Sequence, residues 1–187
     1  MKTETRKEEI TRIAAVLFKE KGYSAVTMRD LATAIGIKAA SLYNHIHSKQ
    51  EILTGIIISL AEEFTLGMDA ILSYQGSSLE KIEKIVELHV RITSKSTYEM
   101  ASLNNDWMHL QDQLSYYMSL RANYENNFRT IVKQGVTNGE IITANPEVVL
   151  FSVLSTLRSL YLWIPYNVPV SELSKDLNAI IMKGIKV

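Results

Sequence analysis

The sequence predicts an all-α protein, and three observations support this fold class. Apolar residues recur at helical spacing along most of the 187 residues, and no segment alternates between apolar and polar residues for long enough to form a strand. Only eight glycines and three prolines interrupt the chain, so its helices can be long. We expect about nine helices, divided between an N-terminal domain over residues 1–48 and a larger helical domain over residues 49–187.

Three helices are predicted in the first domain. The first covers residues 8–21, where the apolar positions share one face. Thr27 begins the second helix as its N-cap, with Asp30 three residues later in a variant of the capping box, and Gly36 ends it. A third, short helix is predicted over residues 39–45. Two short helices joined by a tight turn that contains glycine form a helix-turn-helix unit.

The second domain begins with a long helix. Ser48 caps this helix, which is predicted to run from residue 49 to about residue 74. Asn145 followed by Pro146 marks another helix start, and Pro165 is expected to end that helix. The remaining helices are predicted over residues 79–95, 98–110, 113–138, 147–164 and 171–183.

Charge is unevenly distributed, although the net charge is zero. Residues 1–50 contain nine Lys or Arg and five Asp or Glu, a balance of +4, and the remaining residues contain eleven and fifteen, a balance of −4. A basic N-terminal third on a slightly acidic body indicates a head that binds a polyanion. The absence of cysteine, of a signal-peptide pattern and of a long apolar run leads us to expect a cytoplasmic protein that does not enter the membrane.

The predicted helix-turn-helix has an apolar side and an outward side. Ile37 and Leu42 are expected to pack inward, which leaves small and polar side chains at the surface of the short third helix. A helix with small outward residues can enter the major groove of DNA, where Ser41 and Asn44 can read base edges, while other polar side chains donate hydrogen bonds to phosphates. The expected DNA-binding residues are Thr27, Lys38, Ala39, Ser41, Tyr43, Asn44, His45 and Lys49.

Residues 27–53, TMRDLATAIGIKAASLYNHIHSKQEIL, resemble the DNA-binding domain of TetR-family transcriptional regulators. That family shows a Thr, then Asp-Ile-Ala or similar, Ala-Gly-Val, Leu-Tyr-x-His-Phe and Ser-Lys-x-x-Leu, and most of these positions are matched here at fixed spacing. The resemblance covers about residues 6–55 and implies a transcription factor that binds double-stranded DNA. Three positions depart from the pattern: Lys38 replaces the Ser that usually caps the recognition helix, Ala40 replaces Gly or Pro, and Ile46 replaces Phe.

The resemblance also implies a use for the second domain. In the family, the helices after the DNA-binding head enclose a ligand cavity, and the last two long helices form a dimer. Here the helix from Glu147 to Ile164 is apolar on several faces, so it needs cover on more than one side. If this helix and the one from Ser171 to Lys183 pair with a second copy, the homodimer can read a palindrome. The alternative is that these apolar residues fill the core of a monomer.

Aromatic and methionine side chains are concentrated between residues 98 and 128, which suits a site for an apolar small molecule. The alternative is that they are ordinary core residues. This region resembles a subgroup of the family that responds to fatty acyl-CoA or related thioesters, which implies that Arg121 or Arg129 holds phosphates and that Trp107 or Tyr124 lines an acyl tunnel. The candidate ligand-binding residues are Trp107, Met108, Tyr117, Arg121, Tyr124 and Phe128.

The sequence contains no recognisable catalytic set, no glycine-rich phosphate loop and no spacing typical of a metal site. We therefore expect neither an enzyme nor a bound metal or other cofactor. The predicted function is a ligand-responsive transcriptional regulator, a repressor that a small effector releases from its operator. The alternatives are an architectural DNA-binding protein without a ligand, an activator of the same family, and an all-α enzyme with His89 or His109 in a cleft.

Overall fold

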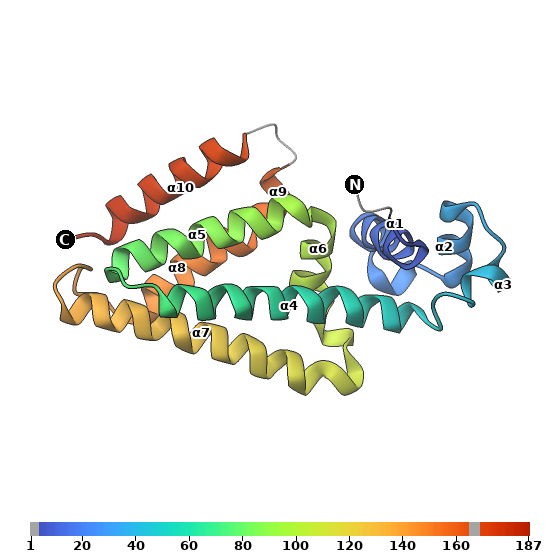
Figure 1. Cartoon of the computed structure of the whole chain (residues 1–187), viewed down its shortest axis with the longest axis horizontal. Coiled ribbons are helices and arrows are strands. Elements are labelled where there is room, and N and C mark those ends of the chain that lie inside the picture. Colours follow the sequence, from blue (N-terminus) through green and yellow to red (C-terminus); the bar gives the residue numbers. More distant parts are fainter. Residues whose placement is uncertain (1–3, 165–168) are drawn as a thin grey trace. The chain divides into compact units, whose positions relative to one another are not determined.

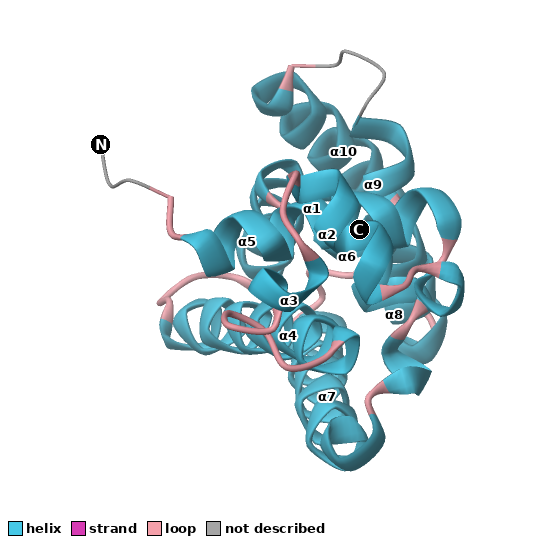
Figure 2. Ribbon diagram, turned by 90° about the vertical axis from the view of Figure 1, so that its right-hand side faces the viewer, coloured by secondary structure: helices cyan, strands magenta, loops and turns pink. Residues whose placement is uncertain are grey.

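The computed structural model describes residues 4–164 and 169–187, and helices make up most of both ranges (Figures 1 and 2). No β-strand occurs within these ranges, where Ile141 and Lys186 form an isolated bridge. The all-α prediction is therefore confirmed. The α-helices are α1 (Arg6–Lys21), α2 (Met28–Ile35), α3 (Ala39–Leu42), α4 (Lys49–Ser73), α5 (Ser78–Lys95), α6 (Thr97–Asn105), α7 (Leu114–Thr137), α8 (Pro146–Arg158), α9 (Leu160–Trp163) and α10 (Val170–Ile185).

Several helix ends follow the capping signals in the sequence. Thr27 and Asp30 form a complete capping box at the start of α2, and Gly36 ends α2 in the left-handed conformation, with φ of 75°. The amide of Glu51 donates to Ser48 Oγ at 3.0 Å at the start of α4. Asn145 accepts from the amide of Glu147 at 2.9 Å at the start of α8. These local hydrogen bonds explain why the corresponding helix starts were predictable.

Two predicted helices are shorter in the structure. The predicted helix 39–45 ends at Leu42, because the amides of His45 and Ile46 both donate to the carbonyl of Leu42, at 3.0 and 3.1 Å, and close a turn. The predicted helix 147–164 is divided at Ser159, whose hydroxyl donates to the carbonyl of Ser155 at 2.9 Å. Such back-bonding competes with regular helix hydrogen bonds and bends helices. Pro165, the expected end of this helix, lies outside the described residues.

The chain between α6 and α7 also differs from the prediction. A helix was expected over residues 98–110, but α6 ends at Asn105 and two 3₁₀ turns follow, Trp107–His109 and Gln111–Gln113. The first residue of the second turn, Gln111, has a positive φ of 48°, which a residue other than glycine adopts only where its surroundings hold it. We refer to residues 106–113 as the α6–α7 junction.

The chain forms two compact units, and each is described by itself. The first unit contains Met1–Ala61 and Tyr98–Met118, and the second contains Glu62–Thr97 and Ser119–Val187. Helices α4 and α7 therefore each contribute to both units. Residues 98–118 pack with the N-terminal unit although the sequence assigned them to the second domain, and the functional division at residue 48 stays a prediction.

The core of the first unit is made by three helices that follow one another in the sequence, α1, α2 and α3. Ile10 and Phe18 of α1, Leu31 of α2 and Leu42 of α3 are all buried, together with Ile46 in the turn after α3. Leu42 is therefore inward as predicted. Ile37, the other residue that was expected to pack inward, is half-buried.

The core of the second unit is organised around α5, which packs against α8, α9 and α10. Ile82, Ile85 and Ile92 place the apolar face of α5 in this core. A Cβ at Gly67 of α4 would lie 2.5 Å from Leu88 Cδ1 of α5, so glycine allows these two helices to approach closely. Among the described residues, no helix combines the length and the apolar character that crossing a membrane requires.

Candidate nucleic-acid interface and effector-binding residues

The first unit presents a polar surface made by α3 and the turn that follows it. Lys38, Ser41, Tyr43, Asn44 and His45 are exposed. The remaining member of the predicted recognition element, Ala39, is half-buried. Leu42 of α3 and Ile46 in the following turn are fully buried, so the exposed predicted residues lie on α3 and its flanking residues around this buried pair.

Thr27 is held at the start of α2 by its own capping box. Its hydroxyl donates to Asp30 Oδ2 at 2.6 Å, and its amide donates to the same oxygen at 2.8 Å. These hydrogen bonds from Thr27 hold the pKa of Asp30 below its usual value. Thr27 is exposed, so the capping role leaves its side chain accessible at the surface of the unit.

Lys38 occupies the N-cap position of α3 and, within the described residues, its side chain makes no capping hydrogen bond to the helix. The sequence predicted this consequence of replacing serine by lysine, and the structure confirms it. Helix α3 has only one turn, so its position depends mainly on the burial of Leu42. The Lys38 side chain is exposed and is therefore able to reach a phosphate.

Lys49 differs from the exposed phosphate donor that the sequence predicted. Its ammonium donates to the carbonyls of Tyr23, Ser24 and Val26 at 2.6, 3.4 and 2.7 Å, and it lies 4.3 Å from the centre of the Tyr23 ring. An ammonium has three hydrogens, and all three have acceptors here. Burial lowers the pKa of Lys49. In the DNA-free protein, Lys49 therefore joins the start of α4 to the segment that precedes α2.

A second contact at the start of α4 involves residues that the sequence reasoning did not select. The carboxylate of Glu51 accepts from Lys7 Nζ at 2.9 Å through one oxygen and from the amide of His47 at 2.9 Å through the other. Lys7 and then the His47 amide hold the pKa of Glu51 below its usual value. The contact joins positions 44 residues apart, so no local pattern could have revealed it.

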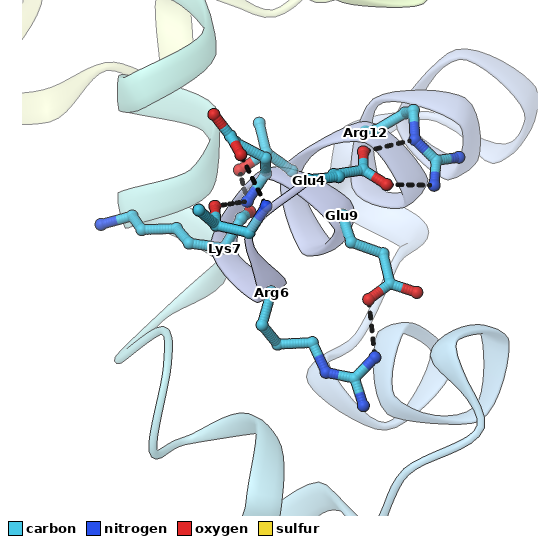
Figure 3. Close-up of polar contacts among 8 residues, drawn as sticks. Glu4, Arg6, Lys7, Glu9 and Arg12 are labelled. Carbon is cyan, nitrogen blue, oxygen red and sulfur yellow. Dashed lines mark hydrogen bonds and ion pairs between the residues drawn. The ribbon is translucent and has the colours of Figure 1, made fainter. Parts of the chain in front are cut away.

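Two arginines of α1 form ion pairs with nearby glutamates of α1 or of the segment just before it. Arg6 donates to Glu9 at 2.6 Å, and Arg12 donates to both carboxylate oxygens of Glu4 at 2.9 and 3.2 Å. Figure 3 shows these two pairs, with Lys7 extending away from both of them.

The α6–α7 junction is tied to the exit of α1 and the start of α4 within the first unit. The hydroxyl of Tyr23 donates to Gln50 Oε1 at 2.8 Å, and Gln50 Nε2 donates to the carbonyl of His109 at 2.7 Å. The rings of Tyr23 and His109 also lie 5.1 Å apart. His109 thus contacts both the exit of α1 and the start of α4, and no pattern in the sequence indicated this connection.

The six predicted ligand-binding residues are divided between the two compact units. Trp107 and Tyr117 belong to the first unit, where their rings stack with centroids 6.1 Å apart. Met108 lies in the same unit and is 59% exposed. The other three, Arg121, Tyr124 and Phe128, belong to the second unit.

The second unit contains a buried group that we call the polar centre: His89, Thr93 and Tyr124. His89 Nε2 and the Tyr124 hydroxyl are hydrogen-bonded at 2.9 Å, and the Phe64 ring lies 4.6 Å from the His89 ring. Burial lowers the pKa of His89 to about 3 and raises that of Tyr124. Within the described residues, His89 Nδ1 and Thr93 Oγ1 have no hydrogen-bond partner.

The charged residues of α7 and α8 in this unit neutralise one another. Arg121 donates to Glu125 Oε1 at 3.1 Å, and Arg158 of α8 donates to the same oxygen at 2.6 Å. Arg129, the alternative phosphate-binding residue, is paired with Glu147. In the part of the chain that the structure describes, no three His, Cys, Asp or Glu side chains come together as a metal site would require.

The helices that were predicted to form the dimer expose large apolar side chains. Phe151 on α8 is 69% exposed, Trp163 on α9 is 66% exposed, and Ile180 on α10 is 69% exposed. Val148 and Leu162 are exposed as well. Large apolar side chains clustered on one surface mark sites of protein association more often than single scattered ones do.

Comparison with known proteins covers both parts of the chain. Residues 10–56 match the family profile of bacterial regulatory proteins of the tetR family, and residues 75–185 match the tetracyclin repressor-like C-terminal domain. The HTH-type transcriptional repressor KstR2 of Rhodococcus jostii (strain RHA1) is 27% identical over 136 residues, which is 72% of this chain and 67% of that protein.

Solved structures show the same fold. The ketosteroid transcriptional regulator KstR2 of Mycobacterium tuberculosis superposes with a TM-score of 0.91 at 20% identity, over 100% of this chain and 97% of that one. AibR, in complex with isovaleryl coenzyme A and operator DNA, superposes with a TM-score of 0.77 at 18% identity, over 94% and 97% of the two chains. The family consists of DNA-binding regulators and not of enzymes, as the sequence predicted. From its N-terminal and C-terminal domains together, the chain belongs to the TetR family of transcriptional regulators.

Proposed function

We propose that the protein is a transcriptional repressor that binds a palindromic operator as a homodimer and leaves it when a small molecule binds. The observation that carries the proposal is the exposed polar side of α3, backed by a fully buried Leu42. The repressor named among the relatives supports the direction of regulation. Activation by a member of the same family is the alternative, and a reporter gene that loses expression when the protein is present would contradict activation.

In this proposal, α3 enters the major groove and the surrounding residues hold the backbone. Ser41 and Asn44 reach base edges, while Tyr43 and His45 donate to phosphates. Lys38 and Ala39 lie where α3 begins, and Thr27 lies at the start of α2. Lys49 contributes by holding the helices in register through the carbonyls of residues 23–26.

The exposed apolar residues of α8, α9 and α10 are proposed to be the dimer interface. Two copies that bury Phe151, Trp163 and Ile180 against each other remove apolar surface from water, which drives association. A twofold dimer places two copies of α3 on successive half-sites of a palindrome. Phe151→Asp is expected to shift sedimentation toward the monomer, and an unchanged dimer would place the interface elsewhere.

The effector is proposed to be a small apolar molecule or an acyl-CoA-like thioester that binds in the cytoplasm. The complex of AibR with isovaleryl coenzyme A supports this class. The residues proposed to contact it are Trp107, Met108 and Tyr117 near the α6–α7 junction and Arg121, Tyr124 and Phe128 further along α7. Aromatic side chains with few polar groups are typical of such sites.

Release from DNA is proposed to follow from a population shift. Helices α4 and α7 each contribute to both compact units. A ligand that binds one conformation of the protein more tightly than another therefore changes the spacing between the two copies of α3 in the proposed dimer. The contact of His109 with Tyr23 and Gln50 offers a second connection, since the junction precedes α7 directly.

The test is operator binding with and without an effector. A genomic selection first identifies the bound duplex, and a thermal-shift screen of acyl-CoA thioesters identifies a ligand that stabilises the protein. Addition of that ligand should weaken operator binding by at least about tenfold, which corresponds to a coupling of about 1.4 kcal/mol. An effector that binds and leaves operator affinity unchanged would refute the release mechanism, and the absence of any ligand would favour an architectural protein.

A further inference from the structure

We propose that Lys7 and the imidazole of His47 are additional contacts to DNA phosphates, and that Glu51 is the internal anion that pairs with Lys7 until DNA binds. The inference rests on the proposed DNA-binding function and adds two residues to the predicted set. It also assigns Glu51 a role opposed to binding, because its carboxylate holds Lys7 and the amide of His47 in the free protein.

The geometry places all three residues in one small cluster. Lys7 Nζ and the His47 amide each lie 2.9 Å from a different oxygen of the same carboxylate. The Lys7 side chain is 64% exposed even while it makes this contact, so the ammonium can leave Glu51 without disturbing packing. The His47 side chain is exposed as well.

The cluster adjoins the proposed recognition surface through the turn after α3. Tyr43, Asn44 and His45 are exposed, Ile46 is fully buried, and His47 emerges directly after this anchor. The buried Ile46 anchors the turn, and the His47 side chain is exposed directly after it. Lys7 reaches this position from α1 through its contact with Glu51.

Two other cations of the first unit are already engaged by protein groups. Lys49 uses its hydrogens on the carbonyls of residues 23–26, and Arg12 is paired with Glu4 through two hydrogen bonds. Lys7 instead donates to one carboxylate oxygen and extends away from Arg6 and Arg12, as Figure 3 shows. An exposed ion pair contributes little to stability, so exchanging Glu51 for a phosphate costs little.

The experiment compares full-length wild type with Lys7→Gln, His47→Ala and Glu51→Gln, and uses Arg12→Gln as the matched control. Arg12→Gln removes the same charge from the same helix but from the pair with Glu4. A fluorescent duplex of mixed sequence serves as the probe, so that no operator needs to be known. Anisotropy titrations are run over a range of salt concentrations, and circular dichroism shows that each variant is folded.

Lys7→Gln should flatten the plot of log affinity against log salt by about 0.9 for each phosphate that the lysine neutralises in wild type, whereas Arg12→Gln should leave the slope unchanged. Glu51→Gln keeps an oxygen that accepts from the His47 amide, frees Lys7 and removes a negative charge, so it should bind several-fold more tightly. His47→Ala removes the exposed imidazole that is proposed to donate to a phosphate, so it should bind the duplex several-fold less tightly than wild type.

Equal salt slopes for Lys7→Gln and Arg12→Gln would overturn the role of Lys7, and weaker binding by Glu51→Gln would overturn the role of Glu51. Binding by His47→Ala as tight as that of wild type would overturn the role of His47. If wild type binds no duplex even at low salt, the proposed DNA-binding function itself fails. That outcome is distinct from a wild type that binds normally while these variants behave like their control.

Discussion

The recognition surface of the first unit and the polar centre of the second unit both depend on polar side chains, but they satisfy those side chains differently. At the recognition surface, Thr27 and Asp30 bond to each other within one helical turn, and the exposed residues of α3 face solvent. At the polar centre, His89 and Tyr124 come from different helices and are buried together. The first arrangement depends on residues that are neighbours in the sequence, and the second depends on packing. Substitutions at the polar centre should therefore change mainly the stability of the protein, whereas substitutions at the exposed surface of the first unit should change mainly DNA binding.

The largest effect is expected from Phe128, which is fully buried in the same unit as the polar centre. Phe128→Ala removes a ring from a packed core and should lower the free energy of unfolding by about 3–5 kcal/mol, measured by urea denaturation. Leu66→Ala is the control, because Leu66 is 70% exposed and its replacement should change stability by no more than about 0.5 kcal/mol. Similar destabilisation of the two variants would mean that Phe128 does not belong to a tightly packed core.

The next effect is the pH dependence of stability that His89 imposes. Because the folded protein holds the pKa of His89 at about 3, below its ordinary value, the folded state binds the proton less readily than the unfolded chain. The stability that depends on a neutral His89 is fully present above about pH 6.5. The free energy of unfolding decreases as the pH falls, by about 2 kcal/mol at pH 5. Urea unfolding at several pH values measures this slope.

His89→Gln provides the comparison for the histidine. It removes the titrating ring and keeps a group that can bond to the Tyr124 hydroxyl. The stability of this variant should change much less between pH 7 and pH 5 than that of wild type. If the free energy of unfolding of this variant fell with pH as steeply as that of wild type, the pH dependence would belong to other groups and not to the buried polar centre.

A smaller effect is expected from Lys49, which belongs to the first unit but behaves like a packing residue. Lys49→Met keeps the apolar stem and removes the donor from the carbonyls of Tyr23 and Val26, so it should lower stability by about 1–2 kcal/mol in the absence of DNA. Thermal unfolding of the DNA-free protein measures this decrease. If stability were unchanged while binding to all DNA sequences weakened, Lys49 would be a phosphate donor as the sequence first suggested.

These regions also differ in how much of them the sequence could predict. The caps at Thr27 and Ser48 and the glycine at the end of α2 are local signals, and the structure confirms them. The inward position of Leu42 follows from the same local pattern. Such features need only a few neighbouring residues, which is why the bounds of α2, the start of α4 and the burial of Leu42 could be predicted from the sequence.

Features that depend on distant segments could not be predicted. The contact between Lys7 and Glu51 joins residues 44 positions apart, and the contact between Gln50 and His109 joins residues 59 positions apart. The two turns of the α6–α7 junction replaced the end of a predicted helix, although apolar spacing continued through it. The division of the predicted ligand-binding residues between two compact units is likewise a property of the packed chain, which no local pattern indicates.

The smallest effect is expected at the N-cap of α3, which depends only on residues that are neighbours in the sequence. Lys38→Ser restores an N-cap side chain at α3, where the described structure has no capping hydrogen bond from the lysine side chain. Because α3 has a single turn, the gain in the free energy of unfolding should be about 0.5 kcal/mol, at the lower end of the range for N-caps. Lys38→Gln is the control for the removal of charge, and it should not stabilise the protein.

The serine variant should nevertheless bind mixed-sequence DNA less tightly than wild type, because a cation has been removed beside the proposed recognition surface. Higher stability together with weaker binding would show that the lysine serves contact with DNA at the expense of the helix, whereas tighter binding would mean that the order of α3 limits recognition.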